Sequence, residues 1–271
     1  MPTRPGWKAL LATTRPISSI EVGALSASAA ISGQGRITIR AIAAGLAMMA
    51  MAMFGFAVND AFDYSRDRAA GVTRPIASGE LSRGDAVRLA CGLLMVALGL
   101  ALVVGTGGAA FAATAVLLVA YSPVAARLPL CKNVYVAAIC CAPLYYGALA
   151  GGKSCPGLSY AALASFVLGR EMLMDADEMQ GYARAGMRTP AVILGHRAAS
   201  LAGHALMLAA SVALVALVRG AVALTSASAA LVSLVWVLAW PGMGESRRIE
   251  LSRLPMLLGS VALAFAHSWR R

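Results

Sequence analysis

The chain has 271 residues, of which 59% are hydrophobic and only 13% are charged, and its formal net charge is +11. This apolar content exceeds what one water-soluble domain needs for its core, which indicates an integral membrane protein. The basic residues lie in short loops between apolar stretches and form no basic domain with interleaved aromatics, which argues against nucleic-acid binding. We therefore expect anionic membrane lipids and a phosphorylated substrate as partners of this charge, and no obligate protein partner is evident.

Apolar stretches of roughly 16 to 20 residues recur along the chain, the length that a helix needs to cross about 30 Å of hydrocarbon. We expect a single all-α domain over residues 1–271, a polytopic membrane bundle of about nine transmembrane helices around a central cavity. The predicted spans are residues 16–32, 41–59, 84–104, 109–125, 134–150, 157–174, 198–218, 222–240 and 254–268.

The distribution of basic residues predicts the orientation of this multi-pass bundle. Seventeen of the 23 Lys and Arg residues lie at the N-terminus or in the loops that follow even-numbered spans. Basic residues are retained on the cytoplasmic side, so we place the N-terminus and these loops there. Two of these loops, residues 59–83 and 170–197, are long and rich in carboxylates, and function is expected in them.

The first acidic loop begins with the sequence NDAFDYSRDR, residues 59–68. If the second span continues through it as helix, Asn59, Asp63 and Asp67 recur every four residues and project from one face toward the membrane-embedded cavity. Asp60 adds a further carboxylate. A modest number of hard oxygen ligands suits Mg²⁺, which completes its shell with water and substrate phosphates.

Between the acidic loops, the stretch from residue 121 to residue 133 carries Tyr121-Ser122 at the end of the fourth predicted span and Lys132-Asn133 just before the fifth. The second acidic loop reads REMLMDADEMQGY, residues 170–182. At 100° per residue, one helical face is acidic and Asp177 points almost oppositely. Because both acidic loops lie on one side of the membrane, their carboxylates are expected to converge and to hold metal ions between them. The acidic face comprises Glu171, Asp175, Glu178 and Tyr182.

These residues carry a resemblance to a known family. The pattern Asn-Asp-x-x-Asp-x-x-x-Asp at residues 59–67, with Arg-Pro-x-x-Ser-Gly at residues 74–79, resembles the first aspartate motif of the UbiA superfamily of intramembrane prenyltransferases. Residues 170–190 are similar to its second motif, and the 121–133 stretch also resembles the family. Nine spans are the architecture of that family, so the resemblance covers nearly the whole chain.

The resemblance implies an enzyme that ionises an allylic isoprenoid diphosphate and transfers the prenyl group to a small lipophilic or aromatic acceptor. Mg²⁺ as cofactor would neutralise the departing diphosphate. The implied metal ligands are Asn59, Asp60, Asp63, Asp67, Asp175 and Glu178. The implied diphosphate-binding residues are Arg74, Lys132, Arg188 and Ser122, and the implied catalytic residues are Asp63, Asp67, Asp175 and Tyr121. Aromatic rings that could stabilise the carbocation are Phe56, Phe62, Tyr121, Tyr145 and Tyr146.

The second motif departs from the family pattern at its last position. The family usually has Asp-x-x-Asp-x-x-Gly-Asp, whereas this chain has Asp175-x-x-Glu178-x-x-Gly181-Tyr182. The departure keeps two other interpretations open: a membrane-embedded terpene cyclase that uses the same ionisation step, and a non-catalytic protein that binds or transports isoprenoid phosphates.

Overall fold

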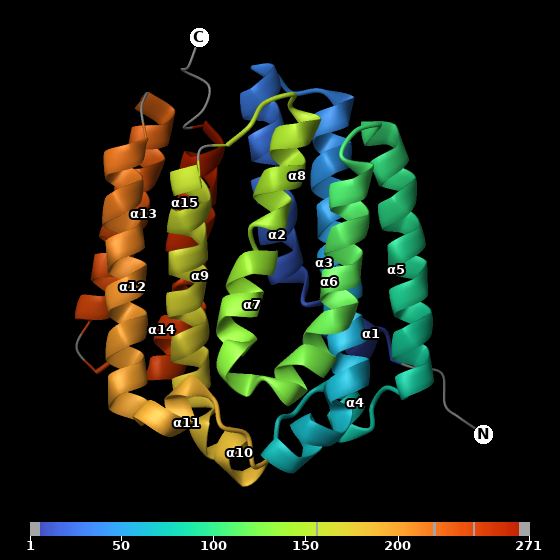
Figure 1. Ribbon diagram of the computed structural model, residues 1–271, viewed down its shortest axis with the longest axis vertical. Coiled ribbons are helices and arrows are strands. Elements are labelled where there is room, and N and C mark those ends of the chain that lie inside the picture. The colour runs from blue at the N-terminus through green and yellow to red at the C-terminus, as the bar shows by residue number, and fades with distance from the viewer. Residues whose placement is uncertain (1–5, 156, 219–220, 241, 266–271) are drawn as a thin grey trace.

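The structure, a computed structural model, describes residues 6–155, 157–218, 221–240 and 242–265. Long helices run side by side, short helices gather at one end of the bundle (Figure 1), and no strand occurs within the described ranges. In chain order the helices are α1 (Trp7–Thr14), α2 (Pro16–Gln34), α3 (Ile39–Ala70), α4 (Pro75–Ser78), α5 (Arg83–Val104), α6 (Gly108–Arg127), η1 (Pro129–Cys131), α7 (Lys132–Ile139), α8 (Ala142–Ala150), α9 (Gly157–Asp177), α10 (Met179–Arg184), α11 (Pro190–Leu194), α12 (His196–Leu217), α13 (Ala221–Ala239), α14 (Glu245–Leu251) and α15 (Arg253–Phe265).

The all-helical membrane bundle predicted from the sequence is confirmed, and every predicted span overlaps a helix. In the described part of the chain, six segments are long and apolar enough to cross a membrane: α3, α5, α6, residues 129–150, α12 and α13. The predicted spans over α2, α9 and α15 are outside this set, and residues 266–268 of the last one lie outside the described residues. The count of nine therefore stays a prediction.

Helix α3 is the longest element and carries the first acidic motif on its final turns. The Thr38 hydroxyl caps its start by accepting a hydrogen bond from the Ala41 amide, and Gly71, with φ of 76°, ends it in the left-handed region that glycine adopts without strain. Its 32 residues span roughly 48 Å at 1.5 Å per residue, more than the ~30 Å hydrocarbon core. The helix is thus long enough to hold its acidic turns at the edge of the apolar layer.

The predicted span at residues 134–150 is broken in the structure. Helix α7 ends at Ile139 and α8 begins at Ala142, with Pro143 in the first turn of α8. Proline has no amide hydrogen to donate to the preceding turn, so a continuous helix loses a hydrogen bond there. The break interrupts the helix, and α7 lies beside α9 at the end that carries the acidic motifs (Figure 1).

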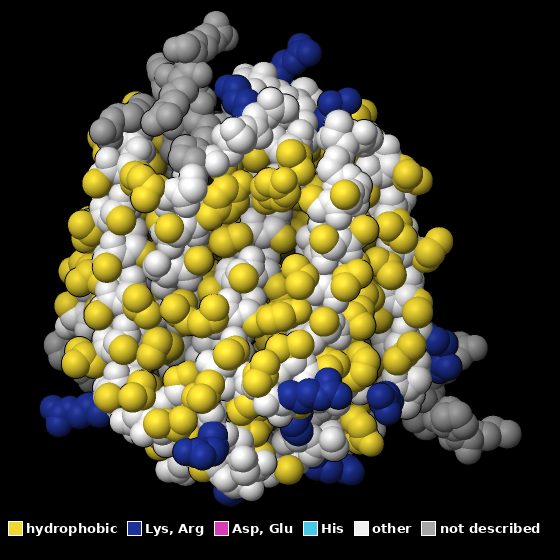
Figure 2. Space-filling view, viewed as in Figure 1, with side chains coloured by type: hydrophobic (Ala, Val, Ile, Leu, Met, Phe, Trp, Pro, Cys, Tyr) yellow, Lys and Arg dark blue, Asp and Glu magenta, His cyan; other side chains and the backbone are white. Residues whose placement is uncertain are grey.

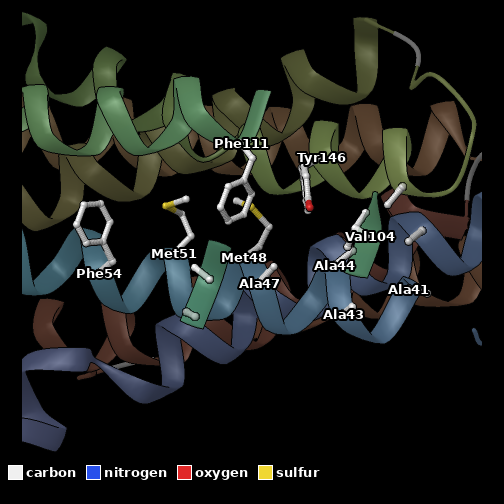
Figure 3. Close-up of a cluster of buried hydrophobic side chains, with 14 of the residues drawn as sticks. Ala41, Ala43, Ala44, Ala47, Met48, Met51, Phe54, Val104, Phe111 and Tyr146 are labelled. Atoms are coloured by element: carbon white, nitrogen blue, oxygen red, sulfur yellow. The ribbon is translucent and has the colours of Figure 1, made fainter. Parts of the chain in front are cut away.

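Small residues let the helices approach closely, as expected for packing in lipid. A Cβ added to Gly169 of α9 would lie 2.5 Å from the carbonyl oxygen of Gly203 of α12. Along α3, side chains including Met48, Met51 and Phe54 form a buried core with Phe111 of α6 and Tyr146 of α8 (Figure 3). The Phe111 and Tyr146 rings pack with centroids 5.1 Å apart. This packing holds α3 against α6 and α8.

Large apolar side chains cover the outside of the bundle. Leu102 of α5, Leu201 of α12 and Val232 of α13 are all exposed, and Figure 2 shows apolar side chains over the whole middle of the visible face, with Lys and Arg at its two ends. Exposed apolar area on this scale is costly in water but favourable against lipid tails. The surface therefore agrees with a membrane location.

Candidate active site

The two acidic motifs lie at the same end of the bundle. The first occupies the last turns of α3, and the second covers the end of α9 and the short helix α10, which packs against α3 (Figure 1). The first segment is helical throughout its motif, whereas the second is helical except at Glu178, the turn residue between α9 and α10. Asn59 of the first motif and Glu171, Glu178 and Tyr182 of the second line one cavity, whereas Asp63, Asp67 and Asp175 are not among its lining residues.

This cavity has a volume of about 200 Å³ and a sharp division between polar and apolar lining. Its body is lined by apolar side chains of α2, α3, α6, α7 and α8: Val22, Met48, Met51, Ala52, Phe56, Leu118, Val136, Ile139 and Pro143. Its polar end is lined by Arg15, Asn59, Arg74, Tyr121, Lys132, Glu171, Glu178 and Tyr182. Such a cavity matches an amphiphile with a charged head and an apolar tail.

The first motif is held by hydrogen bonds from neighbouring elements. The Asn59 side-chain oxygen accepts a hydrogen bond of 2.8 Å from the Ser122 hydroxyl of α6. The Asp63 carboxylate pairs with Arg66 on the next turn, and Asp67 accepts a hydrogen bond of 2.8 Å from Arg74. Ser122, predicted to bind diphosphate, is buried and orients Asn59 in this structure.

Asp60 has a different environment from the other acidic residues of its motif. Its side chain is only 2% exposed and pairs with Arg15 at 2.7 Å and with Arg74 at 3.4 Å. The carboxylates of Asp60 and Asp67 hold the pKa of Arg74 above its ordinary value although burial lowers it. Asp60 therefore anchors two arginines at the polar end of the cavity, and its predicted role as a metal ligand stays a prediction.

Sequence reasoning missed Arg15 as a site residue. It lies between α1 and α2 with φ of 45°, the one non-glycine residue with a positive φ in the described part of the chain. Its guanidinium stacks 4.6 Å from the centroid of the Phe56 ring, and burial lowers its pKa. The only local signal was a basic residue directly before a proline that starts a helix, and that pattern does not reveal a cavity.

The second motif centres on a buried ion pair. Asp175 is paired with Lys132 of α7, and its other carboxylate oxygen accepts a hydrogen bond of 2.8 Å from the Asn133 amide. The Lys132 ammonium also donates a hydrogen bond of 3.0 Å to the Tyr182 hydroxyl, which donates one of 2.7 Å to Glu178. Burial and the nearby carboxylates raise the Tyr182 pKa, so the phenol stays neutral.

Other predicted residues are placed as follows. Tyr121 and Phe56 line the cavity, and Asp177 points away from it and accepts hydrogen bonds from Ser246. Arg188 is exposed in the turn after α10 and is outside the cavity lining, so its role in diphosphate binding stays a prediction.

Three of the aromatic rings suggested for stabilising a cation do not reach the cavity. Phe62 and Tyr145 are exposed on the outside of the bundle, and Tyr146 is buried in the core against Phe111. On α3, Phe62 is rotated by about 100° around the helix axis from Asp63, and its ring lies on the outside of the bundle.

The first motif fits a Mg²⁺ site formed jointly with a substrate. No three His, Cys, Asp or Glu side chains converge as a metal site within the described ranges. Mg²⁺ needs only one or two protein carboxylates when phosphate and water oxygens complete its octahedral shell. The Asn59 oxygen and the carboxylates of Asp63 and Asp67, at four-residue intervals on α3, supply such a set.

Comparison with known proteins gives the same fold and one family. A model of the UbiA prenyltransferase family matches residues 22–266. The chain is 32% identical over 196 residues to digeranylgeranylglyceryl phosphate synthase of Methanopyrus kandleri, covering 69% of this chain and 70% of that protein. It is 33% identical over 148 residues to the enzyme of the same name from Thermococcus gammatolerans, of which it spans only 54%.

Two solved structures share the architecture. An apo UbiA homolog from Aeropyrum pernix K1 has a TM-score of 0.76 and 23% identity, covering 91% of this chain and 97% of its own. A UbiA homolog from Archaeoglobus fulgidus bound to GPP and Mg²⁺ has a TM-score of 0.66 and 16% identity, covering 95% of this chain and 99% of its own. At these identities the likeness establishes the fold.

Proposed function

The chain belongs to the UbiA prenyltransferase family and is an integral membrane prenyltransferase, and from this premise we propose that it ionises an allylic isoprenoid diphosphate with the help of Mg²⁺. The prenyl group then passes to a small lipophilic or aromatic acceptor. The observation that carries the proposal is the cavity itself, which joins a cationic and oxygen-rich end to an apolar body. A diphosphate head and an isoprenoid tail have the same division of polarity.

The polar end is suited to binding the diphosphate. Three cations from separate parts of the chain line this end: Arg15, Arg74 and Lys132. Charge-assisted hydrogen bonds from such groups to phosphate oxygens are stronger than neutral ones. Asn59, Asp63 and Asp67 would hold Mg²⁺, which when bound neutralises charge on the leaving group. Arg66 and Arg74, which pair with these carboxylates here, are only partly buried, and Arg74 can turn toward the diphosphate.

The reaction breaks the bond between the prenyl C1 and the diphosphate oxygen, and the electron pair leaves with the diphosphate. The acceptor then supplies an electron pair to C1 and loses a proton. The apolar walls would exclude water from the allylic cation, and Phe56 and Tyr121 line the cavity with aromatic rings that can stabilise a cation. These residues thus favour transfer over hydrolysis.

The names of the relatives support a proposal for the class of acceptor. The name digeranylgeranylglyceryl phosphate synthase describes a product with a glycerol phosphate head, and that implies a hydroxyl-bearing, lipid-like acceptor for the curated relatives. We propose a lipophilic acceptor with a nucleophilic hydroxyl for this chain, with an aromatic ring as the alternative.

The test is product analysis with purified protein in detergent. The protein is incubated with Mg²⁺ and allylic diphosphates of increasing chain length, with and without membrane lipid extract, and products are identified by mass spectrometry. A prenylated acceptor that appears only with extract supports the proposal. A cyclic hydrocarbon or alcohol made without extract would identify a cyclase, and unchanged diphosphate in all mixtures would contradict catalysis.

A further inference from the structure

The acidic face of the second motif already contains a cation that belongs to the protein. Asp175 is 1% exposed, and its two carboxylate oxygens are engaged by Lys132 and by Asn133. The Lys132 side chain is itself only 8% exposed and lies 4.4 Å from the centroid of the Tyr182 ring. Its ammonium is therefore enclosed by a carboxylate, a phenol oxygen and an aromatic face.

The first motif is more open. The side chains of Asp63 and Asp67 are 13% and 14% exposed, and their partners Arg66 and Arg74 are 27% and 26% exposed. Long, partly exposed arginines can leave a carboxylate at modest cost, because water replaces the lost contacts. A buried ion pair is different, since removal of one partner leaves an uncompensated charge in a low-dielectric environment.

Tyr182 makes the second motif still less suited than the first to binding a metal ion. A carboxylate at this position would add a negative charge to Asp175 and Glu178 and draw a divalent ion to them. The phenol is neutral, accepts a hydrogen bond from Lys132 and donates one to Glu178. A metal ion bound to Asp175 would have to compete with the Lys132 ammonium for the same carboxylate, and the two cations would repel each other.

We propose that Lys132, fixed by Asp175, Asn133 and Tyr182, takes the place of a second metal ion, so that the enzyme binds one divalent cation with its diphosphate. The inference rests on the proposed function, because the single metal belongs to the first motif. An ammonium has three N–H donors, and those directed to Asp175 and Tyr182 leave a third for a diphosphate oxygen. Asp175 and Glu178 are then positioning residues for Lys132 and Tyr182.

The test counts metal ions instead of measuring turnover. Purified protein is titrated with Mn²⁺ in the presence and absence of saturating inorganic pyrophosphate, and bound Mn²⁺ is determined from the loss of the free-ion signal in electron paramagnetic resonance. Wild-type protein should bind one pyrophosphate-dependent Mn²⁺ per chain. Tyr182→Asp should bind two, and the matched control Tyr182→Phe should still bind one.

Two further variants separate the motifs. Asp67→Asn should reduce the pyrophosphate-dependent Mn²⁺ to near zero, whereas Glu178→Gln should leave it at one. Two ions in wild-type protein, falling to one in Glu178→Gln, would overturn this inference and leave the proposed function intact. No pyrophosphate-dependent Mn²⁺ at all, or uptake unchanged by Asp67→Asn, would overturn the proposed metal site and this inference together.

Discussion

Lys132 of α7 and Tyr182 of α10 join the two sides of the cavity, with the ammonium 4.4 Å from the ring centroid and a hydrogen bond of 3.0 Å to the hydroxyl. The two residues are 50 positions apart in sequence and meet because α7 and α9 pack together near the acidic motifs. This contact joins the proposed diphosphate-binding end to the last position of the second motif, where the family pattern has an aspartate and this chain has a tyrosine.

Replacing Asp67 should abolish turnover, because its carboxylate belongs to the proposed Mg²⁺ site and also positions Arg74. We expect Asp67→Ala to lower kcat by at least about a hundredfold, or roughly 2.7 kcal/mol of transition-state stabilisation. Diphosphate release at saturating Mg²⁺ measures the loss. Asp177→Ala is the matched control, since Asp177 faces away from the cavity and should retain most of the activity. Equal activity in both variants would contradict the metal site.

Arg74 should contribute mainly to the use of the diphosphate. Arg74→Ala is expected to reduce kcat/KM for the allylic diphosphate by about tenfold, which corresponds to roughly 1.4 kcal/mol. The control is Arg88→Ala, because Arg88 is exposed on α5 and pairs only with Asp85 among the described residues. Steady-state kinetics at fixed acceptor concentration compares the two. An unchanged kcat/KM in Arg74→Ala would mean that other cations hold the diphosphate.

Tyr182→Phe removes a hydroxyl that holds Lys132 and Glu178 in place. We expect kcat/KM to fall by roughly threefold to tenfold, as for loss of one hydrogen bond to a charged group, while the Mg²⁺ concentration for half-maximal activity stays the same. Because burial raises the Tyr182 pKa above its ordinary value of about 10, wild-type activity should show no loss from phenol ionisation as pH rises toward that value. A Mg²⁺ requirement that shifts in Tyr182→Phe would contradict this assignment.

Close helix contact between α9 and α12 should be sensitive to a single methyl group. A Cβ at Gly203 would lie 2.7 Å from the Gly169 carbonyl oxygen, so Gly203→Ala must push the helices apart. We expect a loss of about 1–3 kcal/mol in the free energy of unfolding in detergent. Gly99→Ala on α5, where no atom lies within 4 Å of the added Cβ, should be neutral or slightly stabilising. Chemical denaturation followed by circular dichroism compares the variants.

Much of the bundle is predictable from the sequence, because apolar runs bounded by glycine and charged residues set the helix limits. The run at 84–104 corresponds to α5, Arg83–Val104, and the run at 109–125 to α6, Gly108–Arg127. The break between α7 and α8 was missed, although Pro143 marks it. An apolar run indicates the length and burial of a segment, but it does not indicate where a proline interrupts the helix inside a bundle.

The candidate site likewise contains features that the sequence predicts and features that it does not. Four-residue spacing on α3 and the acidic face of α9 and α10 follow from helical periodicity alone, and both faces were predicted. Arg15 was missed because it reaches the cavity through the corner between α1 and α2, which only the packed structure defines. The pairing of Lys132 with Asp175 was missed for the same reason: periodicity orders residues within one helix and does not say which helices meet.

The most direct test of the proposed function compares two products of one reaction. Wild-type enzyme with Mg²⁺, an allylic diphosphate and membrane lipid extract should release one diphosphate for each prenylated acceptor that mass spectrometry detects, and excess chelator should stop both together. Diphosphate release without a prenylated product, or equal formation of the product in excess chelator, would contradict metal-dependent prenyl transfer.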